Sequence, residues 1–317
     1  MFEENVPLAL YTTLKAGGAA RRLGIARNRE DLALVSQVAA ENGWPHQILG
    51  WGSNVLPSDR GVEGLVTINR ARRIDIKAGG IVEADCGAGF QDLFLRTAQS
   101  GLGGFEFAVG IPGSVGGALV SNAGAYRNEV STHLQAIEVW WEGERRWLDA
   151  SFMEFSYRDS VLRRENPPAI TLLGVRFQLN PRAPKQIYDD AREYQRQRIS
   201  KQPPPASAGS FFKNVVDAEL AKRIPGLTEG MVASGVVPAG FLIQECGLKG
   251  KRFGGAMIGS RHANFILNVG GASASEIRRL AEYAASQVRK QFGANLEEEA
   301  LYIGDWDGWE ATGLLAH

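Results

Sequence analysis

Two glycine-rich loops in the sequence could hold a phosphate group. The first, Gly50-Trp-Gly-Ser-Asn-Val55, directly follows a strand-like run, and the second is Gly110-Ile-Pro-Gly-Ser-Val-Gly-Gly-Ala118, followed by Asn122-Ala-Gly124. Glycines leave the backbone open, so that successive N–H groups can converge on an anion. The first loop has Val55 where the dinucleotide-binding fingerprint needs a third glycine, and neither loop carries the Gly-Lys-Ser/Thr of a P-loop. Each loop could also be only a tight turn.

A serine and a lysine stand at a spacing that some acyl-transfer enzymes use. Ser210 and Lys213 form a Ser-x-x-Lys pair, but the Ser-Asp-Asn and Lys-Thr-Gly motifs that accompany it in serine acylases are absent from the sequence. The acylase interpretation is therefore disfavoured. The alternative is a polar turn that follows the proline run at 203–205.

Charged residues form two further candidates. The acidic run Glu297-Glu-Glu299 begins a strand-like stretch, where alternation would place Glu297 and Glu299 on one face and Glu298 on the other. Such a run could also be an ordinary solvated face. Arg158 stands in the polar cluster Tyr157-Arg-Asp-Ser160, and by default it would be a salt-bridge partner.

Composition excludes several classes of protein. The chain has 317 residues, 44% of them apolar, and 35 basic side chains balance 35 acidic ones. This length predicts two or three domains, and the balance argues against nucleic-acid or membrane-surface partners, which need a basic excess. Two cysteines, Cys86 and Cys246, are too few for a disulfide framework or a zinc site, so no metal is expected. The N-terminus lacks the features of a signal peptide, and no apolar run reaches membrane-spanning length, so a cytoplasmic protein is expected.

Periodicity predicts the elements that must position these residues. Helical spacing over 30–43 lies before strand-like runs at 47–49 and 64–68, which indicates a parallel α/β unit. Between 69 and 180, strands are expected at 74–76, 81–84, 134–140 and 169–173, with one clear helix at 90–100. A polar helix over 185–201 ends at the proline run 202–206, a natural boundary. A turn at 209–214 and a third α/β segment follow, with a helix over 274–292 capped by Ser273 or Ser275 and closed by Gly293, and a strand over 296–304.

Taken together, these pieces resemble the UDP-N-acetylenolpyruvoylglucosamine reductases, flavoenzymes of peptidoglycan synthesis. The matching motifs run in order along nearly the whole chain and are Thr13-Leu-Lys-Ala-Gly-Gly18, Leu49-Gly-Trp-Gly-Ser-Asn-Val-Leu56, Gly101-Leu-Gly-Gly-Phe-Glu-Phe-Ala-Val-Gly-Ile-Pro-Gly-Ser-Val-Gly-Gly-Ala118, Asn122-Ala-Gly-Ala-Tyr126, Tyr157-Arg-Asp-Ser160, Ala208-Gly-Ser-Phe-Phe-Lys-Asn214, Ala239-Gly-Phe-Leu-Ile243, His262-Ala-Asn-Phe265 and Leu296-Glu-Glu-Glu299. Each motif is moderately specific, and the ordered set is strong.

The resemblance implies an α+β fold. Two subdomains of the vanillyl-alcohol oxidase/PCMH type would bind FAD, at 1–68 with a returning C-terminal strand at 296–317, and at 69–200. A third α/β domain, at 201–295, would bind the substrate. The short stretch between Arg158 and Ser210 is similar to the second type of the family, which lacks an extra loop over the substrate.

The resemblance also implies roles for individual residues. Ser210 would donate a proton, while Arg158 and Glu299 would flank the enolpyruvyl carboxylate and the intermediate. Tyr157, Lys213 and Asn214 would bind the substrate. The residues expected to bind the cofactor are Gly50, Gly52, Ser53, Asn54, Val55, Leu56, Gly110, Ile111, Pro112, Gly113, Ser114, Gly116, Gly117, Asn122, Ala123 and Gly124.

The implied reaction is the NADPH-dependent reduction of UDP-N-acetylglucosamine enolpyruvate to UDP-N-acetylmuramate through FAD. Relatives that attach FAD covalently often have a histidine in the first glycine loop, which this chain lacks, so non-covalent FAD is expected. A monomer is expected as well. The alternative is another FAD-dependent oxidoreductase of the same fold that acts on a different small substrate.

Four departures from the family pattern affect fine details of the FAD and diphosphate contacts more than the reaction. Trp51 and Arg127 stand where the family commonly has glycine. Val215 stands where proline is usual, and Ala300-Leu301 replaces a Val-Arg pair.

Overall fold

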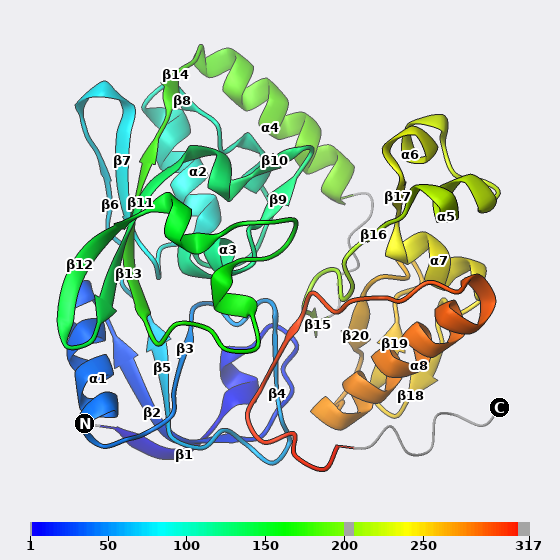
Figure 1. Cartoon of the computed structure of the whole chain (residues 1–317), viewed down its shortest axis with the longest axis horizontal. Helices are drawn as coiled ribbons and strands as arrows, with labels where there is room; N and C mark the ends of the chain where they lie inside the picture. The colour runs from blue at the N-terminus through cyan, green and yellow to red at the C-terminus, as the bar shows by residue number, and fades with distance from the viewer. Residues whose placement is uncertain (1, 200–205, 310–317) are drawn as a thin grey trace. The chain divides into compact units, whose positions relative to one another are not determined.

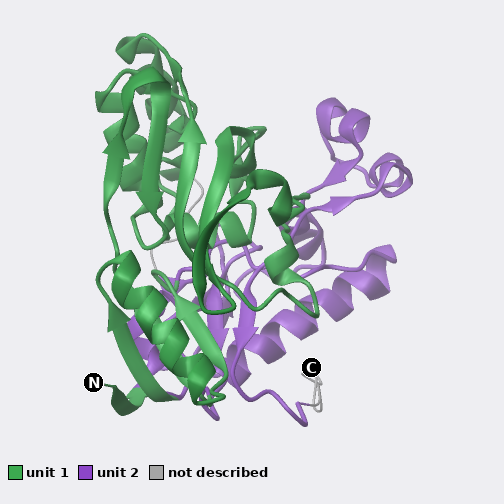
Figure 2. Ribbon diagram, turned by 60° about the vertical axis from the view of Figure 1, so that its left-hand side comes forward, with its two compact units in different colours: residues 1–6, 20–52, 63–200 green, residues 7–19, 53–62, 201–317 purple. Residues whose placement is uncertain are grey.

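A computed structural model describes residues 2–199 and 206–309 of the chain. The chain forms two compact units, coloured separately in Figure 2. Unit 1 comprises residues 1–6, 20–52 and 63–200, and unit 2 comprises residues 7–19, 53–62 and 201–317. The three-part division expected from the resemblance is a different, finer grouping, and it stays a prediction.

Unit 1 begins with a small, largely parallel sheet (Figure 1). Its strands, in spatial order, are β1 (Glu3–Pro7), β2 (Ala19–Ala26), β5 (Leu65–Asn69) and β3 (His46–Leu49). Both β2 and β3 run parallel to β5, and α1 (Arg29–Glu41) contacts β5. The expected parallel unit is therefore confirmed, although β1 and β2 were not predicted. Arg21 and Arg22 interrupt the apolar pattern of β2, which hides it from periodicity.

The second sheet of unit 1 has five strands, and each strand runs antiparallel to its neighbours. In spatial order they are β12 (Glu144–Asp149), β11 (Leu134–Trp141), β13 (Thr171–Gln178), β7 (Ile81–Asp85) and β6 (Ile74–Ile76). Three of the four expected strands are confirmed closely. The fourth, expected at 169–173, begins at Thr171 and continues to Gln178, because Val175 and Phe177 are buried while Arg176 and Gln178 lie on the partly exposed face.

Helices cover this sheet and enclose the aromatic core of unit 1. They are α2 (Phe90–Gln99), α3 (Val115–Val120) and α4 (Pro184–Ile199), and two short strand pairs join β8 (Leu102–Gly103) to β14 (Asn180–Pro181) and β9 (Gly124–Ala125) to β10 (Asn128–Glu129). Phe90, Phe105, Phe107 and Phe177 are almost fully buried, and the rings of Phe105 and Phe177 meet edge to face at 5.0 Å. Edge-to-face rings add to the stabilisation that apolar burial provides.

Unit 2 contains a four-stranded antiparallel sheet with helices packed on it. Its elements are β4 (Val55–Pro57), β15 (Ala206–Ser207), β16 (Val215–Val216), α5 (Ala218–Arg223), α6 (Glu229–Ser234), β17 (Val236–Val237), α7 (Ala239–Glu245), β18 (Arg252–Phe253), β19 (Ala256–Ile258), β20 (Ile266–Asn268), α8 (Ala274–Phe292) and β21 (Leu301–Ile303). The sheet order is β15-β20-β19-β18, β16 pairs with β17, and β21 runs parallel to β4.

Helix α8 begins and ends where the sequence predicts. Ser273 caps it through a reciprocal pair of hydrogen bonds with Glu276, and Gly293 closes it at a φ of 70°. A side chain at that φ would be strained, so glycine is favoured there. One face of the helix, which includes Ile277, Leu280 and Val288, is buried in the core of unit 2.

Three expectations for the C-terminal half need correction or fall outside the description. The strand expected over 296–304 is regular only at Leu301–Ile303, because 297–299 bond to a different segment, described below. The turn expected at 209–214 is extended from Phe211 onward. Residues 202–205 of the proline boundary lie outside the described residues. Over residues 2–199 and 206–309, no helix combines the length and apolarity that a membrane crossing requires.

Candidate functional site

The two glycine loops meet inside unit 1. The side chain of Ser114 lies so close to the α-carbon of Gly50 that a β-carbon on Gly50 would overlap it. Ser114 also caps α3, since its hydroxyl accepts a hydrogen bond from the Gly117 N–H at 3.2 Å. The second loop therefore contains a short helix that the sequence did not predict. Contact between the loops places two predicted cofactor-binding segments side by side.

The second loop is anchored on the segment between β7 and α2. The Phe90 N–H donates to the Gly113 carbonyl at 2.9 Å, and the Gly116 N–H donates to the Cys86 carbonyl at 2.8 Å. A β-carbon on Gly116 would lie 3.0 Å from the Cys86 β-carbon, so only glycine fits there without a shift. In the described part of the chain, the N–H groups of Gly113 and Ser114 have no protein acceptor. Unused N–H groups on glycine-rich backbone fit an anionic oxygen such as that of the FAD diphosphate.

Arg158 binds the end of the same loop. Its guanidinium donates hydrogen bonds to the carbonyls of Asn122, at 3.3 Å, and Gly124. Arg158 has a left-handed backbone, with a φ of 55°, and its guanidinium lies 5.3 Å from the ring of Tyr157. Strained backbone of this kind persists where surrounding contacts hold it. The predicted catalytic arginine is thus joined to the predicted cofactor loop.

The side chain of Asn122 serves the loop itself. Its amide donates to the Ser156 carbonyl at 2.9 Å, and its oxygen accepts from the Ser131 N–H at 3.3 Å. The residue is fully buried and has a φ of 41°, which asparagine tolerates better than most residues. Asn122 therefore shapes the turn that carries Gly124.

In unit 2, the segment after Ser210 pairs with the acidic run. The Glu299 N–H donates to the Phe211 carbonyl, and the Lys213 N–H donates to the Glu297 carbonyl, both at 2.8 Å. Phe212 lies opposite Glu298 in an antiparallel bridge. Ser210 and Glu299, which lie far apart in the sequence, are brought onto neighbouring strands by this pairing.

Asn264 holds this pairing in place. Its side-chain oxygen accepts from the Phe212 N–H at 3.0 Å, and its amide donates to the Phe212 carbonyl at 2.8 Å. The Phe211 N–H donates to the Asn264 carbonyl at 2.7 Å. Asn264 lies within a quoted motif, but sequence reasoning gave it no role. Only its position in a matching motif, beside a buried apolar run, could have indicated one.

Asn54, from the first glycine loop, also reaches the acidic run within unit 2. Its amide donates to the Glu299 carbonyl at 3.0 Å, and its own carbonyl accepts from the Leu301 N–H at 3.0 Å. The side-chain oxygen of Asn54 is buried and has no partner among the described residues. A buried acceptor without a donor fits a hydrogen bond from a ligand.

The first two glutamates of the acidic run have different environments. Glu297 is exposed and forms a 2.5 Å ion pair with Lys213, whose side chain is only 9% exposed. Glu298 is partly buried and accepts from the Tyr302 hydroxyl at 2.8 Å, and burial raises the pKa of this carboxyl. The expected alternation along the strand is therefore present at these two residues, and a uniformly solvated face is excluded.

The remaining predicted site residues divide between the two units. Asn214 accepts a hydrogen bond from the Ala239 N–H at 3.2 Å, at the start of α7. Unit 1 contains Arg158, Gly50, Gly52 and the second loop, whereas Ser53–Leu56, Ser210 and Glu299 belong to unit 2. Within each unit, the structure brings predicted cofactor and catalytic residues together.

Two of the four departures have a clear backbone setting. Arg127 has a φ of 64°, a left-handed conformation that explains why relatives commonly have glycine there. Trp51 donates from its ring nitrogen to the Gly87 carbonyl at 3.4 Å, and its side chain is partly exposed. Neither residue occupies the backbone of the second loop between Gly110 and Gly117.

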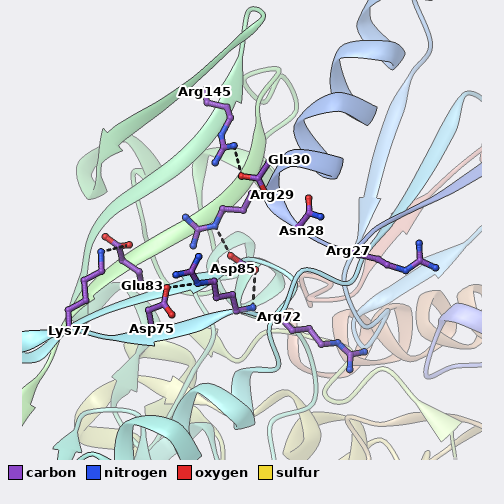
Figure 3. Close-up of a pocket in the computed structure, with 11 residues that line it drawn as sticks. Arg27, Asn28, Arg29, Glu30, Arg72, Asp75, Lys77, Glu83, Asp85 and Arg145 are labelled. Carbon is purple, nitrogen blue, oxygen red and sulfur yellow. Dashed lines mark hydrogen bonds and ion pairs between the residues drawn. The ribbon is translucent and has the colours of Figure 1, made fainter.

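A charged cavity of about 380 Å³ lies elsewhere in unit 1 (Figure 3). Four ion pairs line it, Arg29 with Asp85, Arg73 with Asp75, Lys77 with Glu83 and Arg145 with Glu30. Arg27 and Arg72 also line it, and both are exposed. None of the predicted site residues lines this cavity, so its volume does not identify the site.

Comparison with known proteins covers nearly the whole chain. Residues 21–145 match the model of an FAD binding domain, and residues 199–303 match that of the UDP-N-acetylenolpyruvoylglucosamine reductase C-terminal domain. The UDP-N-acetylenolpyruvoylglucosamine reductase of Caldicellulosiruptor saccharolyticus is 36% identical over 310 residues, which cover 96% of this chain and 93% of the relative. That of Carboxydothermus hydrogenoformans is 37% identical, covering 95% of this chain and 94% of the relative.

A solved structure agrees with these matches. The crystal structure of the Thermus caldophilus UDP-N-acetylenolpyruvylglucosamine reductase superposes with a TM-score of 0.76 at 33% identity, and covers 96% of this chain and 100% of that one. The expected α+β fold, an FAD-binding part followed by the C-terminal domain of this family, is confirmed.

Proposed function

The chain belongs to the UDP-N-acetylenolpyruvoylglucosamine reductase family, and from that premise we propose how its residues reduce the enolpyruvyl group of UDP-N-acetylglucosamine enolpyruvate with NADPH. The observation that carries the proposal is the pairing of Phe211 with Glu299, which puts Ser210 beside an acidic residue. The product is UDP-N-acetylmuramate, a precursor of peptidoglycan.

The glycine loops hold the diphosphate of FAD, which supplies hydride transfer when bound. Support comes from the N–H groups of Gly113 and Ser114, for which residues 2–199 and 206–309 supply no acceptor, and from the contact between Gly50 and Ser114. The buried oxygen of Asn54 is a hydrogen-bond acceptor, so it suits a hydroxyl or N–H donor of the bound cofactor and not the diphosphate. The loops lack a histidine that could attach the cofactor, so FAD is held without a covalent bond. The protein supplies position and charge, while the redox chemistry belongs to the cofactor.

Ser210 donates the proton that completes the reduction. Hydride addition to the terminal carbon of the enolpyruvyl group leaves enolate-like charge on the side of the carboxylate. The adjacent carbon must then receive a proton, and a positioned donor contributes roughly 10²–10⁴-fold in rate. A serine hydroxyl is a weak acid, but an enolate is a strong base. Glu299, on the neighbouring strand, either orients this group or shares the proton with it.

Arg158 stabilises the negative charge that develops on the substrate. A fixed guanidinium is most effective where water is excluded and where its position does not change during the reaction. The hydrogen bonds from Arg158 to Asn122 and Gly124 supply that fixed position. Tyr157, Lys213 and Asn214 bind the UDP-sugar, and Lys213 provides positive charge for its diphosphate.

The resemblance to the family and the sequence suggest further properties, which we add to the proposal. The substrate is a cytoplasmic metabolite, so the protein works in the cytoplasm. It acts as a monomer, belongs to the second type of the family, needs no nucleic acid and does not insert into a membrane. Three domains divide the work, at 1–68 with 296–317, at 69–200 and at 201–295.

The Ser210→Ala variant tests this assignment. NADPH should still bleach the flavin absorbance of the variant, whereas adding UDP-N-acetylglucosamine enolpyruvate should not restore it at the parent rate. Restoration as fast as in the parent would remove Ser210 from the proton-transfer step. A parent protein that NADPH bleaches, but that this substrate does not reoxidise, would identify a different FAD-dependent oxidoreductase.

A further inference from the structure

Arg198, in the last turn of α4, packs directly on the second glycine loop. A β-carbon added to Gly110 would lie 2.9 Å from the δ-carbon of Arg198. Gly110 has a φ of 70°, so the loop exposes bare backbone to this side chain. Helix α4 also contacts the short 3-10 helix Glu106–Ala108, which leads into Gly110. The arginine is therefore a neighbour of the proposed cofactor loop.

The guanidinium of Arg198 is held in place but not neutralised. It lies 6.0 Å from the ring of Tyr126, which stacks on Tyr194 at 4.0 Å and donates from its hydroxyl to the Tyr194 carbonyl. The Nε of Arg198 is buried and has no hydrogen-bond acceptor, and no carboxylate pairs with the side chain in the described part of the chain. Burial lowers the pKa of Arg198, a hydrogen bond to the Tyr126 side chain opposes this, and the nearby charge of Arg158 lowers the pKa further.

Such an arrangement is unfavourable in the free protein. Burying a charged group without a partner costs free energy, and a second cation nearby adds repulsion. A cation near a helix C-terminus gains roughly 0.3–1 kcal/mol from the helix dipole, but that gain needs no burial. Arg196 lies in the same turn, is largely exposed and pairs with Glu193. A bound anion beside Gly110 would offset the cost of burying the charge of Arg198.

We propose that Arg198 and the Gly110 loop form a subsite for a diphosphate oxygen. An arginine is suited to this chemistry, because its planar group can donate two parallel hydrogen bonds to one phosphate. Two ligands carry a diphosphate, FAD and the UDP-sugar, and the inference rests on the proposed function for the second of them. The subsite lies wholly within unit 1.

Binding measurements on three full-length variants test the subsite. Arg198→Met removes the positive charge. Arg198→Lys keeps the charge but cannot donate the two parallel hydrogen bonds of a guanidinium. Arg196→Met is the matched control in the same helical turn. FAD affinity is measured by quenching of flavin fluorescence with FAD-free protein. UDP-sugar affinity is measured from the perturbed flavin spectrum of the holoprotein without NADPH. Arg198→Met should lower the affinity for one of the two ligands by roughly 10- to 100-fold. The affinity of Arg198→Lys should be intermediate, and that of Arg196→Met should lie within about twofold of the parent.

Thermal unfolding separates this role from a structural one. Without ligands, Arg198→Met should melt at or above the temperature of the parent, because an unpaired cation is removed, while the stabilisation by the affected ligand should shrink. Unchanged affinity for both ligands, or a lower melting temperature of the ligand-free variant, would overturn the subsite. If the parent binds FAD but not the UDP-sugar, the proposed substrate fails, while the FAD measurement still decides the role of Arg198.

Discussion

Replacing Asn264 with alanine should weaken both the stability and the second half-reaction of the enzyme. Its side chain satisfies both backbone groups of Phe212, at 3.0 and 2.8 Å, and it is only 3% exposed. Alanine would leave a buried N–H and a buried C=O without partners, each at a cost of about 1–3 kcal/mol. The free energy of unfolding should fall by about 2–5 kcal/mol. This is less than the largest sum of the two costs, because a water molecule that enters the vacated space can bond to one of the two groups.

The effect on catalysis follows from the position of Phe212. This residue lies between Ser210 and Lys213 and opposite Glu298, so a loosened Phe212 shifts Ser210 relative to Glu299. Misplacing a catalytic group by about 1 Å can cost on the order of 100-fold in rate. We expect kcat to fall by roughly 10- to 100-fold with a smaller change in KM, because the variant keeps every group that touches the substrate.

Stopped-flow absorbance and urea unfolding measure the two effects separately. Bleaching of the flavin by NADPH should keep its rate in Asn264→Ala, while reoxidation by the substrate should slow. Asn268→Ala is the control, because the side chain of Asn268 also bonds to backbone in unit 2, at the Leu14 carbonyl, while only its backbone, which the substitution keeps, pairs with Ala206 in the chain before Ser210. The reasoning is refuted if Asn264→Ala reoxidises as fast as the parent, or if the control slows reoxidation equally.

Three further perturbations have defined outcomes. Burial lowers the pKa of His46 to about 4 from its ordinary 6.5, so the unfolded chain binds more protons than the folded protein between these pH values. The parent should therefore lose up to about 3 kcal/mol of stability as the pH falls from 6.5 to 4. In urea unfolding across that range, the free energy of unfolding should depend less on pH for His46→Gln than for the parent, and an equal dependence would contradict this. Asp59 accepts from the N–H groups of Ala274 and Ser275, both at 2.8 Å, so Asp59→Ala should cost about 0.5–2 kcal/mol in thermal unfolding, whereas an unchanged melting temperature would exclude a capping role. Gly116→Ala should weaken FAD binding, because the new methyl group would press on Cys86 at 3.0 Å and displace the loop; a parent-like FAD affinity would show that the loop position is unimportant.

Local sequence signals predicted the four longest helices, α1, α2, α4 and α8, and four of the five strands of the large sheet, but not the short helices α3, α5, α6 and α7 or strand β12. Helix α8 is the clearest case, because a serine before the apolar stripe and a glycine after it act within a few residues. Strand β11 was equally clear, since its apolar residues recur over one continuous run. Strand β2 was missed, because the charges of Arg21 and Arg22 conceal a strand that lies between β1 and β5 in the sheet.

The glycine loops could be located but not interpreted from spacing alone. Their composition indicates exposed backbone, while the ordered resemblance to a reductase family supplied FAD as the ligand. The need for glycine at Gly50 is visible only in the fold, because it arises from Ser114, which approaches from the other loop. The helix α3 inside the loop likewise depends on the cap that Ser114 forms.

By itself, the sequence determined which residue types are present for catalysis, the order of the motifs and the helices with strong local caps, because these depend on short-range chemistry. Tertiary structure alone decided the partners. It joined Ser210 to the Glu299 strand through Asn264, fastened Arg158 to the Asn122–Gly124 turn, and buried Arg198 against Gly110. Each of these contacts links residues separated by tens of positions, and the packing of whole elements, which no local pattern encodes, brings them together.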